Sequence, residues 1–318
     1  MKRRDFMIQI AKATAAASAL TGSGVWLAGR TPEIASDVYH IPSFGIDRKS
    51  LPYDLIAVHG SDAKEMIAAA LRAMGGMEKF VSPGDRVLIK PNVGFDRPPI
   101  LGATTSPEVV GAVVQTCVAA GAGRVIVSDN PINSPLASFT RSGIAAVTQA
   151  AGGEVRYLAE RDFRPTAIGG VAIGDFDTAS ELLREVDKVI GVPALKDHNR
   201  AGMSFAMKNW YGLLGKGRNR FHQDIHNVVA DLAMMMIPTL IIGDATRIHM
   251  TNGPTGGSPA DVKSGNTIIV AADAVAVDAY GIKLLERSLS DCPSIQLAVE
   301  RNIGVADLSA LRVEEINV

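Results

Sequence analysis

The segment that decides the fold is residues 87–130. Three pieces of it carry the argument, in chain order: VLIKPN (87–92), SPEVVGAVVQTCVAAGA (106–122) and GRVIVSDN (123–130). The first and the last are short apolar runs that end in polar residues, which is typical of buried strands. Between them, Ser106 at an N-cap and Pro107 at the first helical position predict the start of a helix. A strand–helix–strand order predicts a right-handed crossover and therefore a parallel sheet.

The same alternation of strand and helix patterns extends on both sides of this segment. It predicts an α/β protein: a mostly parallel sheet with helices on both faces, a Rossmann-like three-layer arrangement, in a single domain over residues 36–318. Further strands are expected at 54–60, 154–158, 171–176, 188–195, 239–244, 266–273 and 311–318. Further helices are expected at 62–76, 141–151, 179–186, 204–214, 222–236 and 274–287.

Composition excludes several classes of protein. The 318 residues include 32 Lys and Arg against 33 Asp and Glu, a formal net charge of -1, which argues against a nucleic-acid partner. Two cysteines, Cys117 and Cys292, are too few for an iron–sulfur cluster held by this chain alone or for a cysteine-rich zinc site. Cys117 lies in an apolar run and is expected to be a buried free thiol, although a disulfide between the two is open in an exported protein.

The N-terminus, MKRRDFMIQIAKATAAASALTGSGVWLAG, has the layout of a signal peptide. Arg3 and Arg4, followed by Asp5 and two apolar residues, resemble the twin-arginine pattern, and the Ala-rich stretch after them is only weakly hydrophobic. We therefore expect residues 1–35 to be a twin-arginine signal segment, the twin-arginine export machinery to be a partner, and the mature protein to be periplasmic or otherwise extracytoplasmic. An uncleaved membrane anchor is the less favoured alternative, because Lys12 shortens the uncharged run.

Polar side chains follow the predicted strands at the points where the strands end. In open α/β sheets, ligands bind beyond the carboxyl ends of the strands, so these side chains are expected to meet at one rim. Asp273 has an equally good explanation as the cap of the helix that follows it. The residues expected at the rim are Lys90 and Asn92 after 87–89, Asp129 and Asn130 after 125–127, Lys196 and His198 after 189–195, Asp244 after 240–242, and Asp273 after 268–270.

These residue types suit the chemistry of a small anion. Lysine ammonium groups bind carboxylate or phosphate oxygens, and histidine is the side chain that titrates nearest neutral pH. We therefore expect Lys90, Lys196, His198 and Asp244 to be catalytic, with His198 as a general acid or base. The residues expected to bind the ligand or a cofactor are Asn92, Asp129, Asn130, Lys208, Asn209, Gly253, Gly256 and Gly257.

The segment 193–226, PALKDHNRAGMSFAMKNWYGLLGKGRNRFHQDIH, is the richest in polar residues. Its basic loop at 216–220 predicts either anion binding or a solvated surface. His222 and His226 are four residues apart, a spacing that places two imidazoles on one helical face, where both could bind one divalent metal ion. Helix surface or buried hydrogen bonding explains the same pair without a metal.

The loop NGPTGG, Asn252 to Gly257, is rich in glycine, so its backbone N–H groups could form an anion-binding nest. It is not a Walker loop, and no G-x-G-x-x-G stands at a strand–helix turn, which argues against the usual nucleotide and dinucleotide sites. No G-x-S-x-G elbow is present, which argues against an ordinary serine hydrolase.

Several of these segments together resemble a known family. VLIKPN, TSPEVVGAVVQTCVAAGAGRVIVSDNP, VPALKDHNRAGMSFAMKNWYGLL, GDATRIHMTNGPTGG and AADAVAVDAYG resemble, in this order, the landmarks of the domain-of-unknown-function family 362 (DUF362) over about 55–318. Some family members carry an appended ferredoxin-like domain with cysteine clusters, and this chain lacks it. The first strand–helix–strand unit also resembles that of nickel-dependent lactate racemase-like proteins, which would imply a Lys196 and His198 site for a small hydroxy acid or a metal cofactor.

Two functions are consistent with these observations. The first is an exported enzyme that acts on a small carboxylate or phosphate substrate through Lys, His and Asp side chains, with or without a bound divalent metal. The second is a non-catalytic exported protein that holds a metal or cofactor, or serves a redox partner. In the second case the rim would be a ligand cradle, and His222 and His226 would carry more weight.

Overall fold

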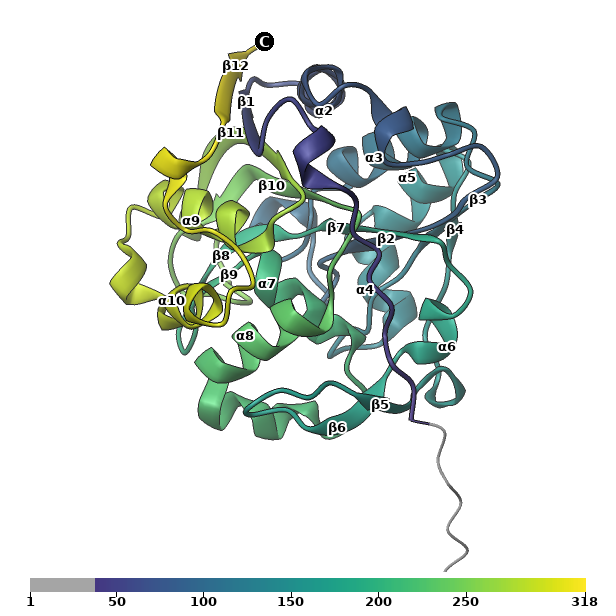
Figure 1. The fold of residues 1–318 in the computed structure, drawn as a ribbon, viewed down its shortest axis with the longest axis vertical. Coiled ribbons are helices and arrows are strands. Elements are labelled where there is room, and N and C mark those ends of the chain that lie inside the picture. Colours follow the sequence, from purple (N-terminus) through teal and green to yellow (C-terminus); the bar gives the residue numbers. More distant parts are fainter. Residues whose placement is uncertain (1–37) are drawn as a thin grey trace, which may run out of the picture. The chain divides into compact units, whose positions relative to one another are not determined.

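One large sheet with helices on both faces organises the chain from Tyr39 to Val318. The structure is a computed structural model that describes residues 38–318, so the predicted signal segment at 1–35 lies outside the described residues. The strand order is β12-β1-β11-β10-β7-β2-β3-β4, with β8 against β10 and β9 against β8 (Figure 1). The strands of this sheet are β1 (Leu55–His59), β2 (Arg86–Pro91), β3 (Arg124–Val127), β4 (Glu154–Val155), β7 (Lys188–Val192), β8 (Ala194–His198), β9 (Gly202–Ser204), β10 (Leu240–His249), β11 (Val262–Ala271) and β12 (Val313–Asn317).

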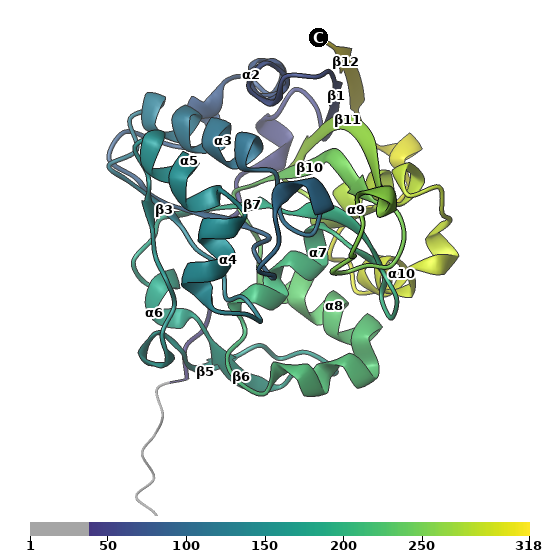
Figure 2. The same ribbon diagram turned by 180° about the vertical axis from the view of Figure 1, so that it is seen from behind.

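The helices form two layers, one on each face of the sheet (Figures 1 and 2). Side chains alternate along each strand, so that Ile89 packs with α2, α3 and α5 while Leu88 packs with α7, α8 and α9. The predicted class, a mostly parallel α/β sheet covered on both faces, is confirmed. The helices are α2 (Ala63–Ala73), α3 (Pro107–Ala119), α4 (Pro135–Arg141), α5 (Ile144–Ala150), α6 (Ser180–Leu183), α7 (Ala206–Asn209), α8 (Ile225–Met235), α9 (Ala274–Leu284) and α10 (Pro293–Glu300).

One strand of the main core runs against the others. β2 pairs in parallel with β3 and β7, and β7 with β10, whereas β11 is antiparallel to both β10 and β1. The connection between β10 and β11 is a loop at 250–261 without a crossover α-helix, which suits antiparallel neighbours because parallel strands are usually joined through such a helix. The carboxyl end of β11 therefore lies at the opposite edge of the sheet from those of β2, β3 and β10.

Several element boundaries differ from the sequence-based expectation. Pro193 divides the expected strand at 188–195 into β7 and β8, and Gly143, with φ +77°, separates α4 from α5 within the expected helix at 141–151. The expected helix at 204–214 ends as an α-helix at Asn209 and continues as a 3₁₀ turn over Trp210–Leu213. The expected edge strand at 171–176 is instead β6 (Asp175–Thr178), which pairs with β5 (Arg164–Ala167) in a separate two-stranded sheet.

Both cysteines are buried free thiols, as expected for Cys117. Burial raises the pKa of Cys117 to about 12 and that of Cys292 to about 11, which keeps both thiols protonated and unreactive. Within residues 38–318, none of the helices combines the length and the apolar character that crossing a membrane requires.

Candidate functional site

A small cavity of about 80 Å³ opens where β2, β3 and β8 end, beside α7. This is the rim that the sequence predicts, and most of the predicted site residues meet there. The predicted residues that line the cavity are Lys90, Asn92, Asp129, Asn130, Lys196, His198, Lys208, Asn209 and His222.

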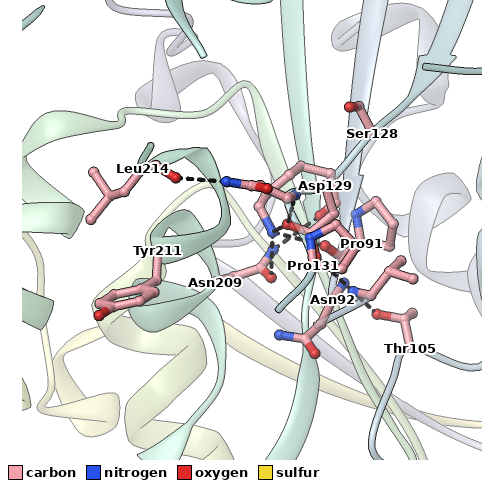
Figure 3. Close-up of polar contacts among 12 residues, drawn as sticks. Pro91, Asn92, Thr105, Ser128, Asp129, Pro131, Asn209, Tyr211 and Leu214 are labelled. Atoms are coloured by element: carbon pink, nitrogen blue, oxygen red, sulfur yellow. Dashed lines mark hydrogen bonds and ion pairs between the residues drawn. The ribbon is translucent and has the colours of Figure 1, made fainter. Parts of the chain in front are cut away.

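Lys90 and Asp129 form a buried ion pair at the centre of this site, with 2.7 Å between Lys90 Nζ and Asp129 Oδ1. Lys90 Nζ also donates to Asn209 Oδ1 at 3.1 Å and to the Pro91 carbonyl at 2.9 Å. Asp129 Oδ2 accepts from the Val93 amide at 2.7 Å, so both charges are well satisfied. Figure 3 shows Asp129 and Asn209 directed toward this common centre. Burial lowers the pKa of Lys90, and the Asp129 carboxylate opposes that shift.

Lys196 is equally buried but has different partners. Its Nζ donates to Asn92 Oδ1 and to the Ala103 carbonyl, both at 2.8 Å, and it forms no ion pair with a described residue. The Phe95 ring lies 5.2 Å from Nζ. Burial, followed by the positive charge of Lys208, lowers the pKa of Lys196 to about 7.

Lys208 and Arg218 add further positive charge to the cavity wall. Lys208 Nζ lies 5.0 Å from the centre of the Tyr211 ring, and burial lowers the pKa of Lys208 to about 8. The Arg218 guanidinium is buried and donates to backbone carbonyls, among them Asn130 at 2.6 Å and Leu214 at 3.2 Å. These bonds hold the loops of the cavity together, and none of the described carboxylates forms an ion pair with the Arg218 guanidinium, although Asp129 acts on it at longer range.

The two histidines of the cavity carry their protons on different nitrogens. His198 Nδ1 accepts from the amides of Arg200 and Ala201, both at 3.2 Å, which places the proton of neutral His198 on Nε2. Burial, together with Lys208 and Lys196, lowers the pKa of His198 to about 2, so this imidazole stays neutral.

His222 shows the opposite pattern. Its Nδ1 lies 3.2 Å from the Asn219 carbonyl and 3.0 Å from the Tyr211 hydroxyl, which itself donates to the Arg218 carbonyl at 2.6 Å. Because a carbonyl only accepts, His222 Nδ1 must carry the proton, and the lone pair is on Nε2. The rings of His198 and His222 are stacked, with 6.2 Å between their centres. Burial lowers the pKa of His222 as well.

Asp244 and Asp273 lie away from the cavity, which corrects the prediction for both. Asp244 Oδ2 accepts from the Ser106 amide at 2.7 Å, and Oδ1 accepts from Thr246. Asp244 therefore holds the start of α3, and both of its carboxylate oxygens accept from groups of the protein. Asp273 caps α9 at the opposite sheet edge by accepting from the amides of Val275 and Ala276, in line with the capping alternative.

The glycine-rich loop also differs from its predicted role. Its amides do not form an open anion site, because the Asp261 carboxylate accepts from Gly257 and Ser258 as well as from the Asn252 side chain. Gly253 donates to Asp197, and Gly256 packs against the His249 ring. Of this loop, Pro254 is the residue that lines the cavity, whereas Gly253, Gly256 and Gly257 do not.

The helical argument for a metal at His222 and His226 is wrong. His222 belongs to a 3₁₀ turn at Arg218–Asp224, and His226 lies in α8, so the two do not share one helical face. Within residues 38–318, no three His, Cys, Asp or Glu side chains gather closely enough to hold a metal ion. An imidazole that binds a metal through Nε2 donates from Nδ1, and His198 has the reverse arrangement.

Sequence reasoning missed Tyr211, Ser204 and Phe95, which also line the cavity. Tyr211 lies in the segment 210–213, where a continuous helix was expected, and its 3₁₀ turn directs the ring toward Lys208 and His222. Ser204 pairs with Lys196 across β8 and β9, a hairpin that the pattern of apolar residues did not indicate. Phe95 is part of a long loop without a periodic pattern.

The fold and the site define a class: an α/β protein with a cationic cavity at the carboxyl ends of its parallel strands. Residues 87–283 match the family model described as domain of unknown function (DUF362). A thylakoid-associated protein of Synechocystis is 30% identical over 258 residues, which is 76% of this chain and 74% of that protein. The chain therefore belongs to the DUF362 family. Among solved structures, the lactate racemase apoprotein of Thermoanaerobacterium thermosaccharolyticum aligns with a TM-score of 0.40 and 12% identity, over 75% of this chain and 60% of that chain.

Proposed function

We propose that this DUF362 protein is an exported enzyme that acts on a small carboxylate or phosphate substrate in the strand-end cavity. One observation carries the proposal: the cations Lys90, Lys208 and Arg218 all line a cavity whose lining, entirely within the described residues, contains one carboxylate, Asp129. That carboxylate is already paired with Lys90. Buried charges need partners, so the surplus positive charge favours an anionic ligand.

Lys208 is the best candidate to bind the anion directly. No hydrogen bond from its Nζ to a described residue competes for its charge, and the Tyr211 ring beneath it leaves the ammonium free to turn toward the cavity. Lys90 and Arg218 would attract the anion through their positive charge without bonding to it, because their N–H groups already donate to oxygens of the protein.

The stacked imidazoles supply a proton acceptor and a proton donor. The Nε2 lone pair of His222 suits a general base, and the Nε2–H group of His198 suits a neutral hydrogen-bond donor to a substrate oxygen. A histidine kept neutral by its surroundings can polarise a carbonyl in this way. The role of general acid or base expected for His198 is thus proposed for His222 instead.

A panel of small acids tests this proposal directly. Phosphate, acetate, lactate and pyruvate should each be assayed by thermal shift and calorimetry, and at least one should bind. Lys208→Met should weaken that binding about tenfold or more, because a charge-assisted hydrogen bond contributes about 1.5–3 kcal/mol. Lys79→Met, at an exposed lysine of the 3₁₀ turn Met77–Lys79 that does not line the cavity, is the matched control and should bind like the wild type. A protein that binds none of these acids would contradict the proposal.

Assistance by a divalent metal is a separate question. The lone pair on His222 Nε2 could bind a metal ion. That ion would need further ligands from the substrate or from water, because no three metal-binding side chains gather among the described residues. Plasma mass spectrometry of untagged protein, purified without chelator, should show well below one transition metal ion per chain. About one metal ion per chain would contradict the metal-free form of the proposal and favour a metal-assisted enzyme.

Export rests on the N-terminal sequence alone. Replacing both Arg3 and Arg4 by Lys should retain the full-length chain in the cytoplasm, because the twin-arginine machinery reads that pair. Cell fractionation of the two proteins measures the outcome. Equal export of the variant would contradict this route.

A further inference from the structure

The two most buried lysines of the cavity differ in the number of oxygens around Nζ. Lys90 Nζ has three acceptors, Asp129 Oδ1, Asn209 Oδ1 and the Pro91 carbonyl, which match the three N–H groups of an ammonium ion. Lys196 Nζ has two, Asn92 Oδ1 and the Ala103 carbonyl. Two acceptors match the two N–H groups of a neutral amine and leave one position on the nitrogen for its lone pair.

The surroundings of Lys196 favour the neutral amine. Both of its acceptors are uncharged oxygens, and the charged groups that face it are mainly cations, Lys208 on α7 and Lys90 on β2. Asp129 acts on it only at longer range and is bonded to Lys90. A lysine that is removed from water and placed beside another cation is the arrangement that makes an amine nucleophilic.

We propose that Lys196 forms a Schiff base with the carbonyl carbon of a small 2-oxo acid bound in this cavity. The inference deepens the proposed function, on which it rests, by naming the substrate class. A 2-oxo acid carries both groups that the site addresses: a carboxylate for Lys208 and a carbonyl for Lys196. One buried water occupies on the order of 10–15 Å³ of such a cavity, so the space suits a molecule of roughly five to eight non-hydrogen atoms.

The step balances with the groups that line the cavity. The lone pair of Lys196 Nζ attacks the carbonyl carbon, and one amine proton passes to the former carbonyl oxygen, which gives a carbinolamine. His222 Nε2 can accept that proton, and His198 Nε2–H can donate to the oxygen that develops negative charge. His222 can then take up a proton from water and pass it to the hydroxyl group, which leaves as water while the nitrogen lone pair forms the C=N bond, with no oxidant or reductant. The product is a protonated imine that keeps the one N–H group of the carbinolamine, and this N–H can still donate to Asn92 Oδ1.

Reductive trapping tests this assignment on the wild-type protein. Pyruvate and sodium cyanoborohydride are added, and peptide mapping by mass spectrometry identifies the lysines that gain a carboxyethyl group. Lys196 should be modified at least about tenfold faster than exposed lysines such as Lys79 and Lys263, because few ordinary amines are neutral near pH 7. Modification of Lys196 at the rate of exposed lysines, or none, would overturn the inference.

Lactate distinguishes a failure of the Schiff-base proposal from a failure of the proposed anion site. Lactate has the same carboxylate but a hydroxyl in place of the carbonyl, so it can bind the cavity without forming an imine. If lactate and pyruvate both stabilise the protein and no adduct forms at Lys196, the Schiff base is excluded while the anion site stands. If neither acid stabilises the protein and no adduct forms, both proposals fall. Lys196→Arg keeps N–H donors at this position but cannot form the imine, and it should lose the adduct.

Discussion

At the scale of single residues, the hydrogen-bond partners of a side chain decide which chemical form it takes. Lys90 and Lys196 end neighbouring parts of the same rim, yet one is set up as an ammonium and the other as an amine. His198 and His222 are stacked, yet their protons are held on different nitrogens by backbone groups. Sequence can supply the residue types at the rim, but these forms depend on how the chain places nearby backbone groups and, for the two lysines, on oxygens of distant residues such as Asn209 and Ala103.

The tautomers of the two histidines can be observed directly. In ¹⁵N-labelled protein, the imidazole nitrogens should show His198 with its proton on Nε2 and His222 with its proton on Nδ1. His198 should also remain neutral through pH 5, because burial and the cations nearby lower its pKa to about 2. Heteronuclear NMR at several pH values measures both properties. A His198 that titrates near pH 6.5, the ordinary value for histidine, would refute the assignment.

The ion pair between Lys90 and Asp129 is expected to be coupled. Lys90→Met leaves the Asp129 carboxylate buried without its cation, which should cost about 3–5 kcal/mol of unfolding free energy. Asp129→Asn in the same chain should recover much of that loss, because it removes the uncompensated charge. Urea denaturation of the single and double variants measures the coupling. Additive losses would show that the pair is not the reason for the effect.

At the scale of elements, the short helix α7 is held in place by a carboxylate of the neighbouring helix α9. Asp278 in α9 accepts from the amides of Ala206 at 2.6 Å and Met207 at 3.2 Å, which are the first residues of α7. α7 carries Lys208 and Asn209 into the cavity. Asp278 is thus a positioning residue that acts on the site through the start of this helix.

Asp278 should make stability depend on pH. Burial raises its pKa to about 7, above the unfolded value of 3.8, so its contribution is fully present below about pH 4 and is lost as pH rises through about 7. Each pKa unit corresponds to about 1.4 kcal/mol. Between pH 5 and pH 8 the wild type should therefore lose unfolding free energy relative to Asp278→Asn. Urea denaturation at both pH values tests this, with the exposed Asp224→Asn as control. A difference that does not change with pH would contradict it.

Sequence reasoning located elements better than it located their directions and ends. A polar residue at the end of an apolar run predicted the rim correctly for Lys90, Asp129 and Lys196, because β2, β3 and β8 run the same way. It failed for Asp273, since no local pattern shows that β11 is antiparallel. The spacing of His222 and His226 failed because the α-helix begins only at Ile225, and His222 lies in the 3₁₀ turn before it.

At the scale of the whole molecule, one carboxylate joins segments far apart in the chain. Asp231 in α8 accepts from the amides of Val171, Ala172 and Ile173, in the turn before β6, and pairs with Arg301 after α10 at 2.7 Å. The side chain is fully buried. It therefore ties the small β5–β6 sheet and the end of α10 to the helical layer.

Asp231→Ala should destabilise the whole fold. It leaves three amides and one guanidinium without their acceptor, which should cost about 3–5 kcal/mol. Chemical denaturation should show one cooperative transition at a lower midpoint. Asp224→Ala, at an exposed position just before the same helix, should change little. A loss at Asp231 as small as that of the control would mean that these segments hold together by apolar packing alone.

The alternation of β8 has a consequence for insertions and deletions. Lys196 and His198 line the cavity, while Asp197 between them bonds to Gly253 and Arg287. Loss of a single codon just before this strand would slide its side chains by one position and exchange the two faces. A carboxylate would then enter the cavity in place of a lysine and an imidazole, and the proposed anion site would become one that repels anions. Length changes should thus be far less tolerated here than in the exposed loop before β3, although neither alters the composition of the chain appreciably.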